Sequence, residues 1–220
     1  MTTDNKDTVP DLISTDRLEA FSDGVFGVAI TLLILSIQVP HLKDIPGRDL
    51  LPTLANEWAS WLSYILSFAN IGIGWINHHQ LFRRIKKVDV ILLTLNLLIL
   101  LFATIIPFPT ALLAEYFRDA DGQRAAAAIY GITHVGISSA FLFVWLYASF
   151  AHLLDEHVTS EAIRAGIRRR IIGITLYIVA TALVLVNALV SVGMYFAIAI
   201  YYLLTSNLRQ QSEHNFRRSD

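Results

Sequence analysis

The sequence contains no cysteine, and charged residues are scarce in it. Without cysteine the chain can form neither a disulfide nor a thiolate-ligated metal site. Aspartate, glutamate, lysine and arginine make up 16% of the 220 residues, whereas soluble domains average about 25%. Hydrophobic residues make up 55%, against about 45–50% in soluble domains. This composition indicates a membrane protein.

Five stretches of the chain lack charged residues completely: 24–40, 58–82, 90–114, 125–154 and 171–208. A helix needs about 20 apolar residues to cross about 30 Å of hydrocarbon. Each of the first four stretches therefore predicts one crossing. The fifth is long enough for two, with a reversal at 187–193, because Asn and Gly tolerate the backbone angles of a tight turn. The sequence thus predicts an all-α membrane protein with six transmembrane helices.

Local signals indicate where these helices begin and end. Asp16 followed by Glu19 resembles a capping box, so we expect the first helix to begin near Thr15–Asp16 and to run to Val39. Pro107 and Pro109 predict a kink near the outer end of the third helix. The fifth helix is expected to begin after the arginines at 168–170, and the sixth to end near residue 207.

The distribution of lysine and arginine predicts the orientation of the chain. With the N-terminus in the cytoplasm, 13 of the 17 basic residues lie on the cytoplasmic side, and four lie outside. We therefore expect both termini in the cytoplasm and interpret the basic residues as topology signals and phospholipid contacts, not as a nucleic-acid surface. The expected division is a polar cytoplasmic segment at 1–15, a transmembrane domain at 16–209 and a cytoplasmic tail at 210–220.

The first predicted helix carries ionisable residues close to its uncharged run, Asp23 being the deepest. Such a group costs about 2.5–3.5 kcal/mol inside a bilayer, so we expect Asp23 to face protein or water. The second helix runs antiparallel and carries polar residues at the same end. The sequence therefore predicts a buried network that joins Ser22 and Asp23 to the side chains of Asn77, His78 and His79.

Several uses of this network stay open at this point. It can pin two helices together, or it can relay protons or coordinate an ion. A metal site built on both histidines is disfavoured, because adjacent residues point about 100° apart on a helix. Farther along the first helix, Gly24, Val28, Thr31 and Leu35 form one stripe at spacings of four, three and four. Taken alone, such a stripe is typical of ordinary helix packing.

The motif Arg17-x-x-x-Phe21-Ser22-Asp23, paired with Trp75-Ile76-Asn77-His78-His79, resembles the transmembrane protein 175 family. That family comprises an endolysosomal potassium channel of animals and its bacterial relatives. The motif occurs once here and animal members carry two repeats, so the chain is similar to the single-repeat bacterial form. The resemblance implies a homotetramer around a central pore lined by four copies of the first helix.

The resemblance also implies roles for individual residues. The pore and its constriction are expected at Val28, Thr31, Leu32 and Leu35. The motif and the network that anchors the pore helix are expected at Arg17, Phe21, Ser22, Asp23, Gly24, Trp75, Asn77, His78 and His79. The implied function is a passive, potassium-selective channel of the bacterial inner membrane. Its implied partners are its own copies, membrane lipids and permeating potassium ions, with no cofactor and no metal beyond the permeating ion.

Two further features refine this expectation. The potassium filter sequence TVGYG is absent, so selectivity must come from a hydrophobic side-chain constriction. The arginines at 168–170 are contiguous instead of spaced along a span, which predicts a voltage-insensitive channel. The competing hypotheses are a proton-coupled secondary transporter that uses Asp23, His78 and His79 as its relay, and a non-conducting membrane scaffold. An enzyme is disfavoured because no nucleophile motif is present.

Overall fold

The computed structural model of the chain describes the backbone of residues 14–40, 49–119 and 121–216, and side chains up to residue 205. Most of the predicted N-terminal segment and the last residues of the predicted tail lie outside these ranges. The described part is all-helical, as predicted, apart from one isolated β-bridge. Its α-helices are α1 (Thr15–Leu32), α2 (Leu50–Asn56), α3 (Trp58–Phe82), α4 (Val90–Ile105), α5 (Pro107–Tyr116), α6 (Gly122–Phe150), α7 (Ser160–Ala182) and α8 (Ala188–Phe216).

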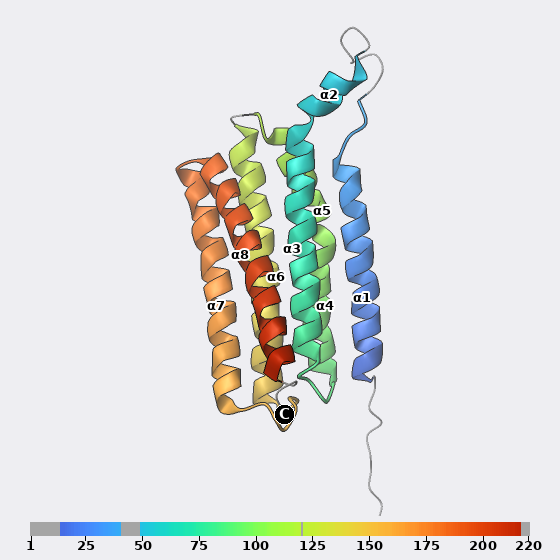
Figure 1. Ribbon diagram of the computed structural model, residues 1–220, viewed down its shortest axis with the longest axis vertical. Helices are drawn as coiled ribbons and strands as arrows, with labels where there is room; N and C mark the ends of the chain where they lie inside the picture. Colours follow the sequence, from blue (N-terminus) through green and yellow to red (C-terminus); the bar gives the residue numbers. More distant parts are fainter. Residues whose placement is uncertain (1–13, 41–48, 120, 217–220) are drawn as a thin grey trace, which may run out of the picture.

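The long helices run alternately up and down the bundle, so that α1 begins at the same end at which α8 finishes (Figure 1). Five segments of the described residues are long and apolar enough to cross a membrane: Thr15–Ser36, Trp58–Phe82, Val90–Tyr116, Gly122–Phe150 and Ala188–Thr205. The expected fifth crossing, α7, contains the arginines at 168–170 and is uncharged only beyond them. The other five of the six predicted crossings are therefore supported by length and composition, and the one at α7 stays a prediction.

The first helix begins where it was predicted but is capped and terminated differently. Its N-cap residue is Ser14, no side chain caps it, and Glu19 binds a histidine of α3 instead. The predicted capping box is therefore wrong. The α-helix also ends before Val39: it ends at Leu32 and continues as a 3₁₀ segment, Leu33–Ser36. The Ser36 hydroxyl donates to the Leu33 carbonyl at 2.7 Å, a bond that tightens this last turn.

Of three other helix ends, one agrees with the predictions and two differ from them. The third crossing is interrupted at Pro107, as predicted, because proline lacks the N–H that would continue the α4 hydrogen bonds. Helix α7 begins at Ser160, earlier than predicted, since the Thr159 hydroxyl caps it by accepting from the Ala162 N–H at 3.2 Å. Helix α8 extends to Phe216, beyond the predicted end.

The reversal between α7 and α8 lies earlier than predicted, at 183–187. A short 3₁₀ segment, Leu183–Leu185, ends α7. The Asn187 side chain then accepts hydrogen bonds from the backbone of Leu189 at 2.8 Å and of Val190 at 3.3 Å, and so caps α8. Gly193, expected in the turn, lies inside α8. The asparagine acts here as a helix cap, and no glycine is needed for the turn.

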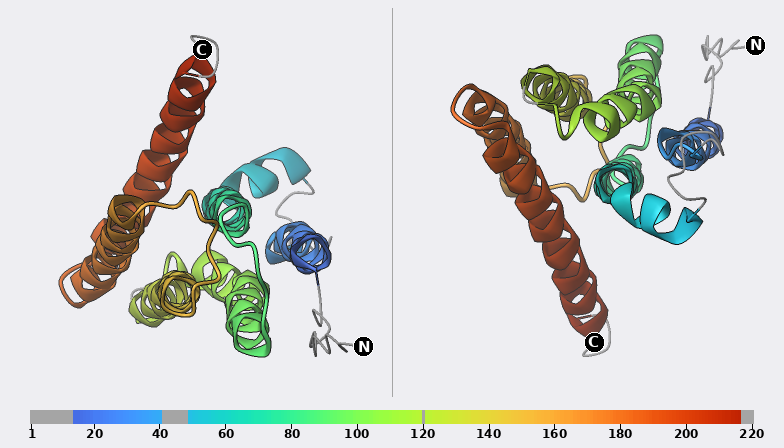
Figure 2. Two further views of the ribbon diagram at one scale, coloured as in Figure 1. Left: turned by 90° about the horizontal axis from the view of Figure 1, so that it is seen from below. Right: turned by 90° about the horizontal axis from the view of Figure 1, so that it is seen from above.

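The buried side chains form two separate hydrophobic cores. The first lies between α1, α3, α4 and α6 and includes Phe26, Leu92 and Trp145. The second joins α3 and α5 to α6, α7 and α8, with Tyr130 and Tyr195 among its fully buried residues. Figure 2 shows the corresponding arrangement from either end, with α3 between α1 on one side and the α7–α8 pair on the other.

A chain of buried polar groups runs through the second core. The Thr110 hydroxyl donates to Ser67 at 2.7 Å, and Ser67 donates to the Tyr130 hydroxyl at 3.2 Å. Asn70 donates to the same tyrosine oxygen at 3.1 Å and accepts from Tyr177 at 2.8 Å. These bonds join α3 to α5, α6 and α7. Any other arrangement of the four helices would leave these buried polar groups without partners, at a cost in free energy. The hydrogen bonds therefore stabilise this one arrangement.

The loop between α3 and α4 is hydrogen-bonded to the loop between α6 and α7, at the end of the bundle where α1 begins. The backbone of Lys86 donates to Leu153 at 2.9 Å, and that of Asp155 donates to Arg84 at 2.9 Å. The Lys86 ammonium also pairs with the Asp155 carboxylate at 3.2 Å. The His157 backbone N–H and then Lys86 lower the pKa of Asp155, so this carboxylate stays charged to a lower pH than that of an unpaired aspartate. These hydrogen bonds and the ion pair hold the segment that connects α3 to α4 in place.

Replacing Gly131 by alanine is expected to lower the free energy of unfolding by about 1–3 kcal/mol, because a side chain there overpacks the second core. An added Cβ would overlap the hydroxyl groups of Thr181 and Tyr195. Gly193→Ala is the matched control, since no atom of the part of the chain that the structure describes, apart from the backbone of α8 itself, lies within 4 Å of a Cβ added there, and alanine favours a helix by up to about 1 kcal/mol. Thermal unfolding of the two purified variants in detergent measures the difference. Equal melting temperatures would contradict this packing.

Candidate functional site

Helix α1 has one face buried in the subunit and one face without a partner there. The buried residues, Leu18, Ser22, Phe26 and Ala29, follow each other at spacings of four, four and three, which is one side of a helix. On the opposite side, Val28 is 57% exposed and Leu35 is 73% exposed. The stripe predicted from the sequence therefore lies on the open face of α1 within the subunit.

The open stripe, defined by Gly24, Val28, Thr31 and Leu35, combines apolar and polar groups. The Thr31 hydroxyl donates to the Val28 carbonyl at 2.8 Å, which leaves the lone pairs of its oxygen free. Among the described residues, no atom outside the backbone of α1 itself lies within 4 Å of a Cβ added at Gly24. Leu32, at the edge of the stripe, is 42% exposed. The subunit thus presents small, hydroxyl-bearing and bulky apolar positions in succession along one line.

At the end where α1 begins, two hydrogen bonds join its exposed side to the antiparallel helix α3. The Trp75 indole N–H donates to the Asp23 carboxylate at 2.9 Å. One turn farther toward the end of the bundle, His79 Nδ1 contacts the Glu19 carboxylate. Residues four apart on each helix pair with residues four apart on the other, as expected for antiparallel neighbours. Glu19 is a partner that the sequence reasoning had used only as a helix cap.

A second, fully buried connection passes through α4. His78 Nε2 lies 2.9 Å from Asn96 Oδ1, and the Asn96 amide donates to the Ser22 hydroxyl at 3.0 Å. Ser22, His78 and Asn96 are all completely buried. The His78 ring stacks on Phe82 with centroids 4.4 Å apart. This connection ties α1, α3 and α4 together at one point.

The residue that completes this connection, Asn96, was missed by sequence reasoning. Its signal was a single amide in the otherwise strongly apolar run VILLTLNLLILLF of α4. Buried amides need partners at nearly all of their donor and acceptor positions. An isolated asparagine within a membrane span therefore indicates a polar partner on a neighbouring helix.

Three residues predicted for the network lie elsewhere. Asn77 faces α7, where Arg169 donates to its side-chain oxygen at 3.2 Å, because Asn77 points about 100° away from His78 around α3. Arg17 lies seven residues before Gly24, on the open side of α1, and is exposed. Phe21 is 55% exposed. Within the described residues, neither Arg17 nor Phe21 takes part in the hydrogen bonds of the network.

The geometry bears on whether the network can relay protons. Asp23 is bonded to Trp75, whose indole only donates a hydrogen bond and cannot accept a proton. His78 is bonded to Asn96, and its second nitrogen, Nδ1, has no partner among the described residues. The hydrogen bonds found there do not connect Asp23 to either histidine. In addition, no group of three or more His, Asp or Glu side chains in the described ranges is placed to hold a metal ion.

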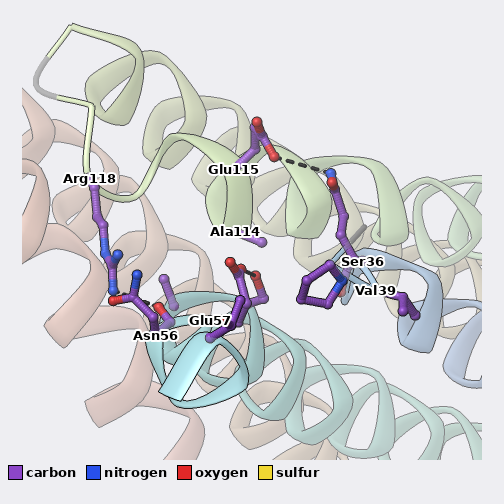
Figure 3. A pocket seen from close by; sticks show the side chains of 12 residues that line it. Ser36, Val39, Asn56, Glu57, Ala114, Glu115 and Arg118 are labelled. Carbon is purple, nitrogen blue, oxygen red and sulfur yellow. Dashed lines mark hydrogen bonds between the residues drawn. The ribbon is translucent and has the colours of Figure 1, made fainter. Parts of the chain in front are cut away.

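A pocket of about 390 Å³ lies at the opposite end of the bundle, beside the end of α1 (Figure 3). It is bounded by the segment after the 3₁₀ turn, by α2 and the start of α3, and by the end of α5. Gln38 donates to the Glu115 carboxylate at 3.1 Å across this pocket. Glu57, on its floor, accepts from the Ser60 hydroxyl at 3.2 Å, and Arg118 donates to the Asn56 carbonyl at 2.6 Å. The hydrogen bond between Gln38 and Glu115 therefore joins the segment after α1 to α5, and two carboxylates line the pocket.

Comparison with known proteins gives consistent similarities over most of the chain. A family model described as endosomal/lysosomal potassium channel TMEM175 matches residues 17–107. A potassium channel of Streptomyces collinus is 42% identical over 187 residues, which are 84% of this chain and 90% of that protein. The crystal structure of a lysosomal potassium-selective channel TMEM175 homolog from Chamaesiphon minutus matches with a TM-score of 0.80 at 39% identity, covering 88% of this chain and 98% of that one.

Animal relatives match over a smaller part of their length. The chicken protein, named endosomal/lysosomal proton channel TMEM175, is 36% identical over 153 residues, which are 67% of this chain but 30% of that protein. The bacterial matches cover nearly the whole of both chains, and the family model spans the motif-bearing helix and its partners α3 and α4. This multi-pass membrane protein therefore belongs to the TMEM175 family.

Proposed function

We propose that this protein is a passive potassium channel of the bacterial plasma membrane, a homotetramer whose pore is lined by the open stripe of α1. The observation that carries the proposal is the division of α1 into a buried face, anchored by hydrogen bonds, and an open face with no partner in the subunit. Closed cyclic symmetry is the usual way in which identical subunits cover such a face. The names of the bacterial relatives supply the ion.

The polarity of the open side of α1 argues against contact with lipid. Asp23 is exposed in the subunit near one end of the stripe, and Thr31 is exposed within it. A carboxylate in contact with hydrocarbon costs about 2.5–3.5 kcal/mol on insertion scales. A face lined by water and neighbouring subunits avoids that cost. The same face of four subunits around an axis therefore accounts for both the apolar and the polar residues.

The proposed mechanism uses rings of side chains in place of a carbonyl filter. Four Leu35 side chains around the axis would form a narrow apolar segment that water enters reluctantly. An ion must lose part of its hydration to pass, and K⁺ loses water at a lower cost than Na⁺. The free lone pairs of Thr31, one turn away, can replace some of that water. Val28 is smaller, so we assign the narrowest point to Leu35.

Charges at the two ends fit a cation pathway with both termini in the cytoplasm. Glu57 and Glu115 line the pocket beside the outer end of α1, and carboxylates at a pore entrance raise the local concentration of cations. The arginines at 168–170 are adjacent residues near the inner end of α7, and a voltage sensor needs charges distributed through a span. The proposed channel is therefore voltage-insensitive.

Two measurements on the purified protein test this proposal. The mass of the detergent-solubilised particle, corrected for bound detergent, should equal four chains of 24.6 kDa. Proteoliposomes that contain the protein should pass K⁺ down its gradient, faster than Na⁺, and without stoichiometric movement of protons. A dimer, or the absence of K⁺ flux in tetramers, would contradict the proposal.

A proton-coupled transporter is the second candidate, because the animal relatives are named proton channels and His78 is buried within the anchoring network. The hydrogen bonds found around Asp23 do not continue to the histidines, which disfavours a relay through all three residues. A pH-sensitive dye inside the same proteoliposomes separates the two candidates. Obligatory alkalinisation or acidification with a fixed ratio to K⁺ flux would favour the transporter.

Replacing Asp23 by alanine is expected to reduce the fraction of tetramer more than it alters ion preference. The substitution removes the acceptor of the Trp75 indole and with it about 1 kcal/mol per subunit, typical of one hydrogen bond. Asp23→Asn is the matched control, because its amide oxygen can still accept from Trp75. Size-exclusion profiles and K⁺/Na⁺ flux ratios are to be compared for both variants. Normal tetramers of Asp23→Ala with a changed flux ratio would instead assign Asp23 to selectivity.

A further inference from the structure

Two carboxylates line the pocket beside the end of α1, and they come from different helices (Figure 3). Glu57, the N-cap residue of α3, accepts from the Ser60 hydroxyl at 3.2 Å. Glu115, in α5, accepts from Gln38 at 3.1 Å. Neither carboxylate forms an ion pair with a described residue. Because a carboxylate can accept about four hydrogen bonds, both glutamates can bind further donors in the pocket.

A buried hydroxyl adds a third acceptor to the pocket. Ser36, the last residue of the 3₁₀ segment, lines the pocket and is 6% exposed. Its hydroxyl donates to the Leu33 carbonyl at 2.7 Å, and none of the described residues donates to its oxygen. A hydroxyl oxygen has two acceptor positions, so a donor of a bound molecule can bond to Ser36. This acceptor lies at the end of the helix that carries the open stripe.

One of the lining residues is a cation, Arg118, and its side chain is already held. Its guanidinium donates to the Asn56 carbonyl at 2.6 Å, and its Cζ lies 5.6 Å from the Trp58 ring centroid. Figure 3 shows this side chain on the other side of the pocket from Ser36. The described lining residues include two glutamates and one arginine, which gives them a net charge of −1. The pocket therefore attracts a cation, most strongly away from Arg118.

The size and the lining of the pocket fit an organic cation better than a metal ion. Its volume of about 390 Å³ lies within the range of about 300–1,000 Å³ that is typical of small-molecule sites. Sites for Ca²⁺ supply about six to eight oxygen ligands, and no group of three or more His, Asp or Glu side chains in the described ranges is placed to hold a metal ion. Val39, Ala59 and Ala114 add apolar surface to the lining. A ligand with cationic ends and an apolar middle matches these groups.

We propose that the pocket binds a short aliphatic diamine, whose two ammonium groups bond to Glu57 and Glu115. An ammonium group has three donors and no acceptor, so it matches a carboxylate and a hydroxyl with free lone pairs. Hydrogen bonds that involve ionised groups are roughly twice as strong as those between neutral groups. The methylene chain lies against the alanines of the lining. Because the two charges of a diamine are separated, neither has to lie next to Arg118.

Occupancy of the pocket has a consequence for ion flux that rests on the proposed function. Glu57 and Glu115 raise the local concentration of K⁺ beside the outer end of α1, and a bound diamine neutralises both. An ammonium group at Glu115 also competes with Gln38, which follows the 3₁₀ segment that contains Leu35. A diamine is therefore expected to lower K⁺ flux without entering the pore.

Equilibrium dialysis of the detergent-solubilised protein against radiolabelled putrescine, a four-carbon diamine, tests the binding. Low ionic strength is used because salt screens exposed charges. The wild type is expected to bind putrescine saturably. The double variant Glu57→Gln/Glu115→Gln is expected to bind it at least about tenfold more weakly, which corresponds to about 1.4 kcal/mol. Glutamine keeps an oxygen that can accept from Ser60 and Gln38, so these contacts are retained.

Two further variants separate the pocket from general effects of charge. Glu161→Gln, the matched control, removes an exposed carboxylate in the first turn of α7, at the opposite end of the bundle, and should leave binding unchanged. Arg118→Gln removes the cation of the lining and is expected to tighten binding. A purely structural role of the two glutamates predicts no such gain.

Any of three results would refute the diamine site. Equal binding by the wild type and the double variant would exclude the two glutamates. Competition by butane-diol as strong as that by unlabelled putrescine would show that charge is not recognised. Complete displacement of putrescine by an equimolar amount of Mg²⁺ would assign the site to a metal ion. Should the double variant unfold, weaker binding by Glu115→Gln alone supports the site, and unchanged binding by it refutes the site.

K⁺ flux in proteoliposomes with putrescine on both sides tests the effect on the channel separately. A decrease in the wild type that disappears in the double variant supports this effect. An equal decrease in both would place the block outside the pocket, and no decrease would refute the effect and leave the binding site intact. Absence of K⁺ flux without putrescine would refute the proposed function, and the dialysis would still report on diamine binding.

Discussion

Replacing Leu35 by asparagine is expected to raise K⁺ flux through the reconstituted protein about tenfold and to bring Na⁺ flux closer to that of K⁺. Leu35 is more exposed than Val28, the other bulky apolar residue of the open stripe, and four copies around an axis would repel water. An amide at this position holds water in the constriction. Lowering the barrier by about 1.4 kcal/mol accounts for a tenfold rate. Flux assays with both ions in identical vesicles measure the effect.

The control for this substitution is Leu185→Asn. Leu185 is 83% exposed, but it lies at the end of α7, away from α1. The same chemical change there should leave both ion fluxes unchanged. If Leu35→Asn also leaves them unchanged, Leu35 does not line the pathway, and the open stripe of α1 has another use.

Replacing Asn96 by leucine is expected to destabilise the subunit by about 2–4 kcal/mol, because it leaves His78 Nε2 buried without a partner, at about 1–3 kcal/mol, and removes the bond to Ser22, at about 1 kcal/mol. The Ser22 hydroxyl still donates to the Leu18 carbonyl at 2.9 Å, and Ser22, His78 and Asn96 are all fully buried. Leucine has a similar volume, so packing alone predicts a much smaller loss. Thermal unfolding in detergent, followed by fluorescence of the native tryptophans, measures the difference.

Thr94→Leu, two residues earlier on α4, is the matched control. Thr94 is exposed, and its hydroxyl donates to the carbonyl of Val90 in its own helix. Leucine there should leave the melting temperature nearly unchanged. A melting temperature of Asn96→Leu equal to that of Thr94→Leu would mean that the buried connection contributes no net stability.

The crossings were predictable because they depend on a one-dimensional property of the chain. A helix in a membrane needs a long run of residues without charge, and such runs are visible in the sequence. The α3 bounds, Trp58 and Phe82, coincide with the limits of one uncharged run, and Pro107 marks the break between α4 and α5. The predicted fifth crossing was harder to support because the arginines at 168–170 lie inside α7.

The turn and cap errors had local causes. Asn187 was taken as part of the turn, but its side chain caps α8 and the turn precedes it. Glu19 was taken as a cap, but it reaches the opposite helix. Asn187 was expected to serve the turn through its backbone and acts through its side chain, and Glu19 was assigned the wrong partner. Polar side chains can satisfy local or distant groups, and the spacing of residues does not distinguish the two.

The site was predictable only where two helices were enough to define it. Antiparallel helices that carry polar residues at the same end predicted that Asp23 bonds to α3, although the partner is Trp75 and not the expected Asn77 or histidines. Asn77 was assigned to the wrong neighbour because its direction around α3 depends on which helix lies on each side. Asn96 was missed because the third helix of the connection cannot be identified before the packing is known. The roles of the stripe residues in conduction remain predictions.

The separation of the two cores has a consequence for how the protein can diverge. Helix α1 packs against α3, α4 and α5, whereas α7 and α8 cover the far side of α3 and α6. The family model accordingly matches residues 17–107, which end where α5 begins. The sequence of residues 17–107 can therefore stay similar to that of the family while the sequences of α7 and α8 change. Natural variants in α7 or α8 should then alter how much protein accumulates and leave the current carried by each assembled particle the same.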